Sequence, residues 1–427
     1  MISSLIKRLQ VFFKDPLYKN AAFLIVSSSF GAVCGFVFWI VVARFYSAEI
    51  VGFSSALFSA ASLLIMFSNL GLGFGLIRYL RSSKDPNKLI NSIFSVVSII
   101  SIIAGTIFVI GVGAWSPGLK LIRENLLFGV IFVAFILINN LFSLIDQTFI
   151  ANRRADFVLS KNVIFNVLRL IFPIVLLSMF GKFGIFISWS IAITVPLFIG
   201  LFFLLPKSEL GYRPAVTIDR KLIVDILHFS FSNYLGDLSW NAPTLILPII
   251  VINTLGPAIS AFFFIAWAIG SIINTIANMM STSLFAEGSN NLNALEHNLG
   301  RSIKMILLLL IPIVAITVVF ADKILVLFGS QYSENATDLL RLLAIANFPF
   351  AINVLYFAQK RVEKKTTIII ILAVLSGAIT IGLSELLLTG MGITGVGIAF
   401  LSGQGAIAVI IIIDWLKNRS IVRKSKT

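Results

Sequence analysis

The chain has 427 residues, of which 58% are hydrophobic and only 12% are charged. Soluble globular proteins carry about a quarter charged residues, so this composition excludes an ordinary soluble domain and indicates a membrane protein with many spans. The net charge of +15 is spread over short basic clusters between apolar runs, which argues against nucleic-acid binding and indicates a role in membrane topology. A single cysteine excludes a metal cluster built from thiolates, and we expect no bound cofactor.

A basic stretch over residues 1–19 opens the chain and is predicted to lie at the cytoplasmic surface, with no cleavable signal expected. Twelve apolar runs follow, each long enough to cross a bilayer, which takes about 20 helical residues. The predicted spans are 20–43, 50–77, 89–114, 125–150, 162–180, 184–205, 223–253, 257–285, 303–321, 338–358, 366–388 and 393–416. We therefore expect an N-lobe over 20–205, a cytoplasmic linker over 206–222, a C-lobe over 223–416 and a basic cytoplasmic tail over 417–427.

Basic residues set the expected orientation, because Lys and Arg concentrate on cytoplasmic connections. With the N-terminus inside, the inner segments hold 26 of the 33 Lys and Arg residues, whereas the outer connections hold five. An even number of spans fits this distribution, since adding or removing one span would place basic clusters on the wrong side. The sequence therefore predicts a multi-pass protein of the cytoplasmic membrane with both termini in the cytoplasm.

The two halves of the chain show a weak internal repeat at an offset near 208 residues. The segment 149–154 after the fourth span matches 356–361 after the tenth, and Asn69 falls on Asn278. Six helices per half would give both copies the same orientation, related by a pseudo-twofold axis along the membrane normal, as in transporters whose halves rock around a central cavity. The predicted fold is all-α, with twelve transmembrane helices in two six-helix lobes.

Polar groups inside spans are costly in lipid, so each is a candidate for the substrate or ion pathway, with helix packing as the rival explanation. Asp237 lies about 14 residues into the seventh span, which is about 21 Å along the helix, and Asn233 lies one turn before it. Pro243 and Pro248 follow and free backbone carbonyls. Asp237 could bind a proton or a sodium ion, or pair with a cation that binds substrate; a structural ion pair within the bundle is the alternative.

Amide side chains share one face of the eighth span, where Asn274 and Asn278 lie four residues apart. For these residues and for the equivalent Asn69, hydrogen bonding between helices is favoured over contact with a substrate. Asp146 lies on a polar stripe near the cytoplasmic end of the fourth span, where it either reaches the membrane surface or lines the pathway.

Three arginines are candidates to contact an anionic substrate, because Arg binds phosphate through paired planar donors. Arg169 lies about seven residues into the fifth span, from which it either snorkels to the cytoplasmic interface or supplies a cation inside the bundle. Arg44 and Arg341 lie near the outer ends of the first and tenth spans, where an interfacial position is favoured.

Small residues indicate close packing or motion at two places. Gly31 and Gly35 form a pattern that lets helices approach closely. The run 70–75 has glycine at every second position near the inner end of the second span, and we expect a flexible gate or a tight packing point there.

A resemblance to a known family is carried by the segments ARFYSAEIVG (43–52), NLGLG (69–73) and RYL (78–80). They resemble the Wzx-type polysaccharide-biosynthesis flippases of the multidrug/oligosaccharidyl-lipid/polysaccharide (MOP) exporter superfamily, which implies a MATE-like fold. The resemblance implies movement of a polyisoprenyl-(pyro)phosphate-linked oligosaccharide from the cytoplasmic to the outer leaflet by alternating access. The expected partners are membrane lipids and polysaccharide assembly enzymes, and a proton or sodium gradient is a candidate energy source.

Two other functions stay open on the residues alone. A cation-coupled multidrug or toxin exporter of the same superfamily would favour acids inside the membrane, and this chain has both acids and arginines there. A membrane glycosyltransferase or polysaccharide polymerase is less favoured, because the sequence shows no long outer loop with clustered acids or a catalytic histidine. The preferred hypothesis is a transporter, not an enzyme.

Overall fold

The structure is a computed structural model that describes residues 16–176, 180–209, 211–290 and 295–424. Some side chains inside the helices are also outside the description, among them those of Asn233 and Asp237. Over the described residues the chain is helical, with connecting loops and no strands, so the predicted all-α fold is confirmed.

The chain divides into two compact units, the N-unit (Met1–Tyr234) and the C-unit (Leu235–Thr427). The division falls inside helix α11 (Arg220–Leu255) and not in the predicted linker 206–222. The reason is that the first turns of α11 pack on the N-unit: a Cβ added at Gly71 would lie 3.1 Å from the backbone oxygen of Ser230.

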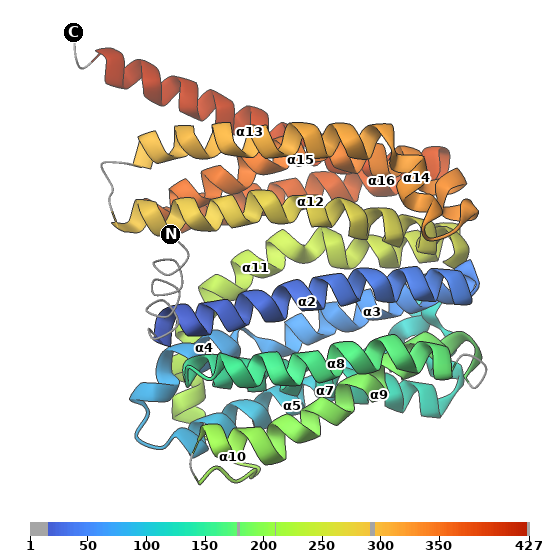
Figure 1. Cartoon of the computed structure of the whole chain (residues 1–427), viewed down its shortest axis with the longest axis vertical. Helices are drawn as coiled ribbons and strands as arrows, with labels where there is room; N and C mark the ends of the chain where they lie inside the picture. The colour runs from blue at the N-terminus through green and yellow to red at the C-terminus, as the bar shows by residue number, and fades with distance from the viewer. Residues whose placement is uncertain (1–15, 177–179, 210, 291–294, 425–427) are drawn as a thin grey trace, which may run out of the picture. The chain divides into compact units, whose positions relative to one another are not determined.

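The helices of the N-unit run along a common direction and are joined by short loops (Figure 1). They are α2 (Pro16–Phe45), α3 (Ala48–Asn69), α4 (Leu72–Tyr79), α5 (Pro86–Trp115), α6 (Leu121–Glu124), α7 (Leu126–Ala151), α8 (Ala155–Val175), α9 (Gly184–Ile199), which continues through one π turn (Gly200–Leu204), and α10 (Leu205–Ser208).

The C-unit begins within α11 and repeats this arrangement with longer helices. They are α12 (Pro257–Asn290), α13 (Leu295–Val319), α14 (Ala321–Val326), α15 (Ser330–Val362) and α16 (Thr366–Lys424).

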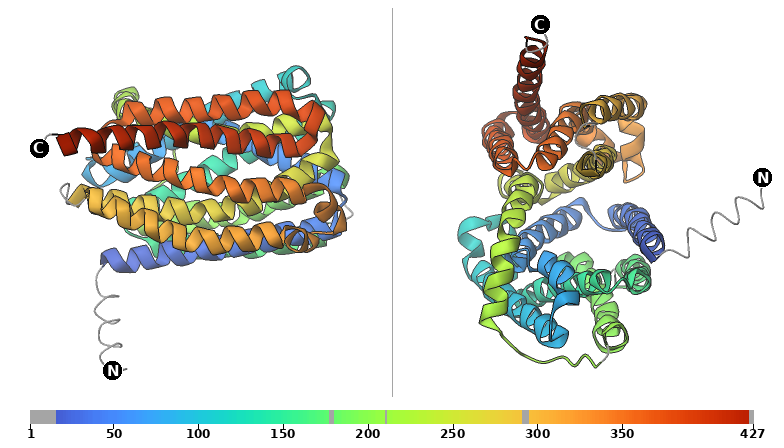
Figure 2. Two further views of the ribbon diagram at one scale, coloured as in Figure 1. Left: turned by 90° about the horizontal axis from the view of Figure 1, so that it is seen from above. Right: turned by 90° about the vertical axis from the view of Figure 1, so that its left-hand side faces the viewer.

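In the described part of the chain, ten helices are long and apolar enough to span a membrane. One of them, Thr366–Lys417, has 52 residues, although about 20 suffice to cross a bilayer. Its backbone leaves the helical region at Gly392 (φ 58°, ψ −148°), and a Cβ added at Gly395 would lie 2.8 Å from Leu387. The chain therefore turns back, so α16 is two adjacent antiparallel helices (Figure 2). With these two and the shorter apolar segment Trp240–Leu255 of α11, the twelve predicted spans are accounted for.

The second predicted span is broken near its inner end. Leu70 and Gly71 both adopt left-handed backbone conformations (φ 51° and 73°), which end α3 and start the short α4. A Cβ at Gly73 would collide with the side chain of Gln147 on α7, and one at Gly75 would collide with Ile226 on α11. Of the two expectations for this glycine run, the structure supports tight packing, because α4 lies directly against both helices.

The repeat is visible in the turns that follow corresponding helices. Arg153 after α7 and Lys364 after α15 both have left-handed backbone (φ 55° and 59°), as do Gly181 and Gly392 before the last helix of each half (φ 51° and 58°). The numbers differ by 211 in both pairs. After Arg153, the Arg154 amide donates to the Phe149 carbonyl at 2.8 Å, and after Lys364, the Lys365 amide donates to the Lys360 carbonyl at 2.9 Å. Both are the hydrogen bond of a Schellman helix end. At the turn after α7 the predicted match of 149–154 with 356–361 is therefore displaced by about one helical turn, a shift that leaves side chains on a similar face.

Large apolar side chains cover the outside of both units. Ile110 of α5 is 63% exposed, Leu308 of α13 is 73% exposed and Leu386 of α16 is 74% exposed. In water such a surface would be an aggregation hazard, whereas lipid tails solvate it. The apolar exterior and the long helices together confirm a multi-pass membrane protein.

Candidate functional site

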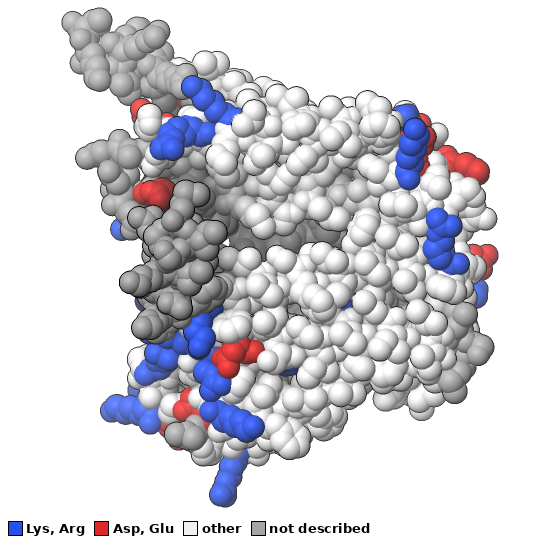
Figure 3. Space-filling model, in the orientation of Figure 1, with Lys and Arg blue, Asp and Glu red and all other residues white. Residues whose placement is uncertain are grey.

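On the face drawn in Figure 3, charged side chains gather near the ends of the helices, and most of the surface between them is uncharged. In the N-unit, Arg81 Nε donates to the Ala151 carbonyl at 2.8 Å, and Asn152 Nδ2 donates to Glu209 Oε2 at 3.0 Å. These bonds join the connections after α4, α7 and α10 at one end. The connections of the N-unit that are richest in Lys and Arg thus lie at the same end of the unit. Their position on the cytoplasmic side stays a prediction.

Helices α2 and α8 are parallel and meet through a ladder of polar groups. The Ala155 amide donates to Asn20 Oδ1 at 3.0 Å, and two turns further along Asn162 Nδ2 donates to Ser27 Oγ at 3.2 Å. The last contact belongs to Arg169, whose Nη2 donates to the Gly31 carbonyl at 2.7 Å. The small residues of α2 thus face a polar stripe on α8.

Arg169 is a buried cation at the deep end of this ladder. Its side chain is 7% exposed, and its guanidinium carbon lies 5.2 Å from the ring centroids of Phe165 and Trp189. Its Nε has no hydrogen-bond partner, and among the described residues no carboxylate lies within 4.0 Å of it. Among the described residues, one carbonyl and two aromatic rings therefore stabilise this charge.

The depth of Arg169 differs from the prediction because α8 begins at Ala155 and not at residue 162. Arg169 lies 14 residues after that start, which is about 21 Å along the helix at 1.5 Å per residue. An arginine at the centre of a spanning helix costs about 2.5–3.5 kcal/mol on insertion scales. The Arg169 side chain is buried against Gly31 of α2 and faces the interior of the bundle, which favours the second alternative, and its depth in the membrane stays a prediction.

Two glycines of α2 make room for this stripe. A Cβ at Gly35 would lie 3.1 Å from Arg169 Nη2, and one at Gly31 would lie 3.6 Å from Asn166 Nδ2. Only the first distance is shorter than ordinary van der Waals contact. The predicted close approach of helices at these glycines is confirmed, and its effect is to seat polar side chains of α8.

Asp146 forms a buried ion pair inside the N-unit. Lys161 Nζ lies 3.1 Å from Asp146 Oδ1, and it also donates to the Phe142 carbonyl at 3.1 Å. The Lys161 side chain is fully buried and that of Asp146 is 19% exposed. The stem of Lys161 packs against Gly200, where a Cβ would lie 3.1 Å from its Cδ. Asp146 thus already has a cationic partner, which reduces its capacity to bind another cation.

Asn69 belongs to a hydrogen-bonded chain between three helices. Asn69 Nδ2 donates to Asn140 Oδ1 at 3.4 Å, and Asn140 Nδ2 donates to Ser101 Oγ at 2.9 Å. Ser101 in turn donates to the Val97 carbonyl at 2.7 Å. This chain links α3, α7 and α5, an arrangement that fits the packing role favoured for Asn69.

A pocket of about 200 Å³ lies among the helices of the C-unit. Asn274 and Asn278 of α12 both line it, so these two predicted residues are together. Trp240, Trp267, Ser376 and Gln404 also line it, from α11, α12 and both halves of α16. Among the residues that the structure describes, none of the lining side chains is charged.

Arg341 and Arg44 lie away from the buried groups. Arg341 Nη1 pairs with Asp338 at 3.3 Å, and its Nε donates to the Val318 carbonyl at the end of α13. Its side chain is 43% exposed. Arg44 is exposed in the last turn of α2, where a cation complements the helix dipole. The interfacial alternative fits both residues.

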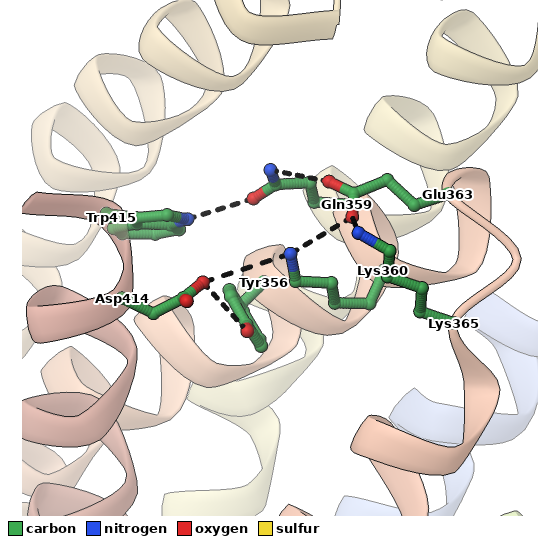
Figure 4. A network of polar contacts seen from close by, with 7 residues as sticks. All are labelled: Tyr356, Gln359, Lys360, Glu363, Lys365, Asp414 and Trp415. Atoms are coloured by element: carbon green, nitrogen blue, oxygen red, sulfur yellow. Dashed lines mark hydrogen bonds and ion pairs between the residues drawn. The ribbon is translucent and has the colours of Figure 1, made fainter. Parts of the chain in front are cut away.

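A polar network fastens α15 to the end of α16 (Figure 4). Lys360 Nζ, almost fully buried, lies 3.0 Å from Glu363 Oε2 and 3.8 Å from Asp414 Oδ2. Tyr356 also donates to Asp414, at 3.1 Å. Burial acts to raise the pKa of Glu363, but its hydrogen bonds to Lys360 and Lys365 lower that pKa below its usual value. Each of these carboxylates has a basic partner, so the network is self-contained.

Two candidates, Asp237 and Asn233, have side chains outside the described residues, and their roles stay predictions. Sequence reasoning missed Lys161 as a buried residue, because a lysine next to a polar segment was assigned to a loop. Asn162 and Asn166 were also missed, although Asn162, Asn166 and Arg169 follow one another at spacings of four and three residues, which is the signal of one helical face.

The chain matches the profile of a family described as "Polysaccharide biosynthesis protein" over residues 17–285. No curated protein matches the chain. Solved structures with 16–17% identity share its fold. Lipid II flippase MurJ, in an inward closed conformation, has a TM-score of 0.78 and 16% identity, covering 93% of this chain and 87% of that one.

Two transporters of the MOP superfamily are also similar in fold. An inward-facing multidrug resistance MATE family transporter has a TM-score of 0.70 and 17% identity, over 93% of this chain and 96% of that one. A transporter from Pyrococcus furiosus, described by the reverse polarity of its binding pocket, has a TM-score of 0.63 and 17% identity, over 96% and 97%. The predicted MATE-like fold is confirmed. Because the family profile matches more than half of its length, the chain belongs to the polysaccharide biosynthesis protein family.

Proposed function

We propose that this protein is a flippase that moves a polyisoprenyl-(pyro)phosphate-linked oligosaccharide from the cytoplasmic to the outer leaflet of the cytoplasmic membrane. The family to which the chain belongs supports a role in polysaccharide biosynthesis. The similar fold of a protein named as a lipid II flippase supports a lipid-linked saccharide as the cargo. Alternating access between two six-helix lobes would carry the polar head across while the lipid tail stays in the bilayer.

The observation that carries this proposal is the buried charge of Arg169. Among the described residues its guanidinium has one hydrogen bond, to a backbone carbonyl, and no acidic partner within 4.0 Å. A phosphate is the anion that matches a planar guanidinium best, because it accepts two parallel hydrogen bonds. We infer that Arg169 contacts, or electrostatically attracts, the phosphate of the substrate during transport.

The acidic groups of the spanning helices argue in the same direction. Asp146 is paired with Lys161, and Asp414 lies near Lys360 and accepts from Tyr356. An exporter of organic cations needs an acid that is available to its substrate or coupling ion. Within the described part of the chain, the buried charge without a partner is a cation, which favours an anionic substrate over a cationic drug.

A complementation experiment tests this function. In a strain that lacks the chain, we expect loss of surface polysaccharide and accumulation of the lipid-linked unit in the cytoplasmic leaflet. Wild-type protein should restore both, Arg169→Lys should restore them in part, and Arg169→Gln should not. Arg123→Gln, at an exposed position outside the spans, is the control and should behave as wild type. Normal polysaccharide and no accumulation in the deletion strain would contradict the proposal.

A further inference from the structure

Three residues that line the pocket of the C-unit carry a buried polar atom that no described residue satisfies. Trp267 is 6% exposed and Ser376 is 3% exposed, yet neither Trp267 Nε1 nor Ser376 Oγ has a hydrogen-bond partner. Asn274 Oδ1 is likewise buried without a partner. All three residues line the pocket. Buried polar groups in native proteins are almost always hydrogen-bonded, so this pocket is built to receive a molecule with donors and acceptors.

Other polar groups close to the pocket do have partners. Asn353 Nδ2 donates to Gln404 Oε1 at 2.7 Å and to the Gln404 carbonyl at 3.0 Å. This pair links α15 to the second half of α16 and fixes the orientation of the Gln404 amide, which lines the pocket. The donors Trp267 Nε1 and Ser376 Oγ and the acceptor Asn274 Oδ1 therefore stay without described partners, beside the oriented amide of Gln404.

Aromatic rings form the rest of the pocket wall. The ring centroids of Trp240 and Phe350 lie 5.3 Å apart at an interplanar angle of 38°. Those of Trp267 and Phe400 lie 4.9 Å apart in an edge-to-face arrangement. These rings hold one another in place, so their faces are rigid. A saccharide ring suits such a wall, because it presents C–H groups on its faces and hydroxyl groups around its edge.

The charge and the size of the pocket narrow the ligand further. Since none of the described side chains that line the pocket is charged, they offer no counter-ion to a phosphate or to an organic cation. Its volume of about 200 Å³ is below the roughly 300–1,000 Å³ of sites for drug-sized ligands. These two properties select a neutral group of about one ring.

We propose that this pocket, lined by Trp240, Trp267, Asn274, Ser376 and Gln404, is a binding subsite for one neutral saccharide ring. The inference rests on the proposed function, in which the cargo carries a glycan, and it assigns recognition of that glycan to the C-unit. Hydroxyl groups of the ring accept from Trp267 Nε1, exchange hydrogen bonds with Ser376 Oγ and donate to Asn274 Oδ1.

Binding of free monosaccharides to the purified full-length protein in lipid nanodiscs tests this subsite. The probes are a neutral hexose, an N-acetylhexosamine and a 6-deoxyhexose, measured by isothermal titration, with the acyclic polyol sorbitol as a control. We expect saturable binding of at least one cyclic sugar at one site per chain, and none of sorbitol. Trp267→Phe, which keeps the ring but removes the donor, and Ser376→Ala should each weaken binding about 2- to 10-fold. Trp115→Phe, at an exposed position in the N-unit, should leave it unchanged.

The outcomes separate this inference from the proposed function. No saturable binding to the wild-type protein, or equal binding by both pocket variants and the wild type, overturns the subsite. If the deletion strain then still accumulates the lipid-linked unit, the flippase function stands without it. Saccharide binding that both pocket variants weaken supports the subsite, even if the deletion strain makes normal polysaccharide and the transport proposal fails.

Discussion

The buried pair of Asp146 and Lys161 makes an asymmetric prediction about stability. Asp146→Asn leaves the ammonium of Lys161, which is fully buried, without its counter-ion. Breaking a buried pair from one side costs about 3–5 kcal/mol. Lys161 keeps its bond to the Phe142 carbonyl, so we expect a loss near the lower limit, about 3 kcal/mol. Lys161→Met should cost less, because the 19% exposure of Asp146 gives its carboxylate access to water.

The double variant decides whether the pair or the individual side chains matter. Asp146→Asn with Lys161→Met removes both charges and keeps similar volumes, and such replacements are often neutral. We therefore expect the double variant to be more stable than Asp146→Asn alone. Thermal unfolding of the full-length protein in detergent measures this, and about 3 kcal/mol corresponds to a fall of roughly 6–12 °C for a unit of this size. Additive losses in the double variant would refute the reasoning.

Three further expectations concern the α2–α8 ladder and the loop before α11. Gly35→Ala should lower transport and thermal stability, because its Cβ would lie 3.1 Å from Arg169 Nη2; Gly31→Ala, with a contact at 3.6 Å, should be neutral or stabilising, and equal effects would contradict this account. The side-chain hydrogen bond from Lys88 lowers the pKa of Asp219. The pair should therefore stabilise the fold above about pH 4 and lose this effect as the pH falls through the lowered pKa. Unfolding measured against pH should show this dependence in the wild type and not in Asp219→Asn. Asp219→Ala should destabilise more than Asp219→Asn, since Asp219 Oδ1 also accepts from two amides at the start of α11; the reverse order in unfolding temperature would exclude this cap.

Hydropathy was sufficient to predict the spans, because lipid requires long apolar runs whatever the tertiary packing. It was less informative at helix ends. The predicted fifth span began at residue 162, whereas α8 begins at Ala155, since polar residues at a membrane surface can continue a helix. This shift of two turns turned Arg169 from a residue near the interface into one deep in the bundle.

Long-range packing could not be predicted from one sequence. The glycine run 70–75 allowed a gate or a packing point, and the residues that decide between them, Gln147 and Ile226, are far away in the chain. Lys161 was taken for a loop residue, because nothing local shows that Gly200 makes room for its stem and Asp146 accepts its charge. The C-unit pocket was foreseen only through Asn274 and Asn278, whose common helical face was visible as a spacing of four.

Transport by purified protein in vesicles tests the central claim most directly. The protein is reconstituted with a fluorescent polyisoprenyl-pyrophosphate saccharide, and the fraction of the saccharide that reaches the opposite leaflet is measured with a membrane-impermeant reagent. We expect the wild-type protein to move the lipid-linked saccharide and Arg169→Gln to lose most of that activity at equal reconstitution, with Arg123→Gln unchanged. Equal rates for Arg169→Gln and the wild type, or no movement by the wild type above empty vesicles, would contradict the account.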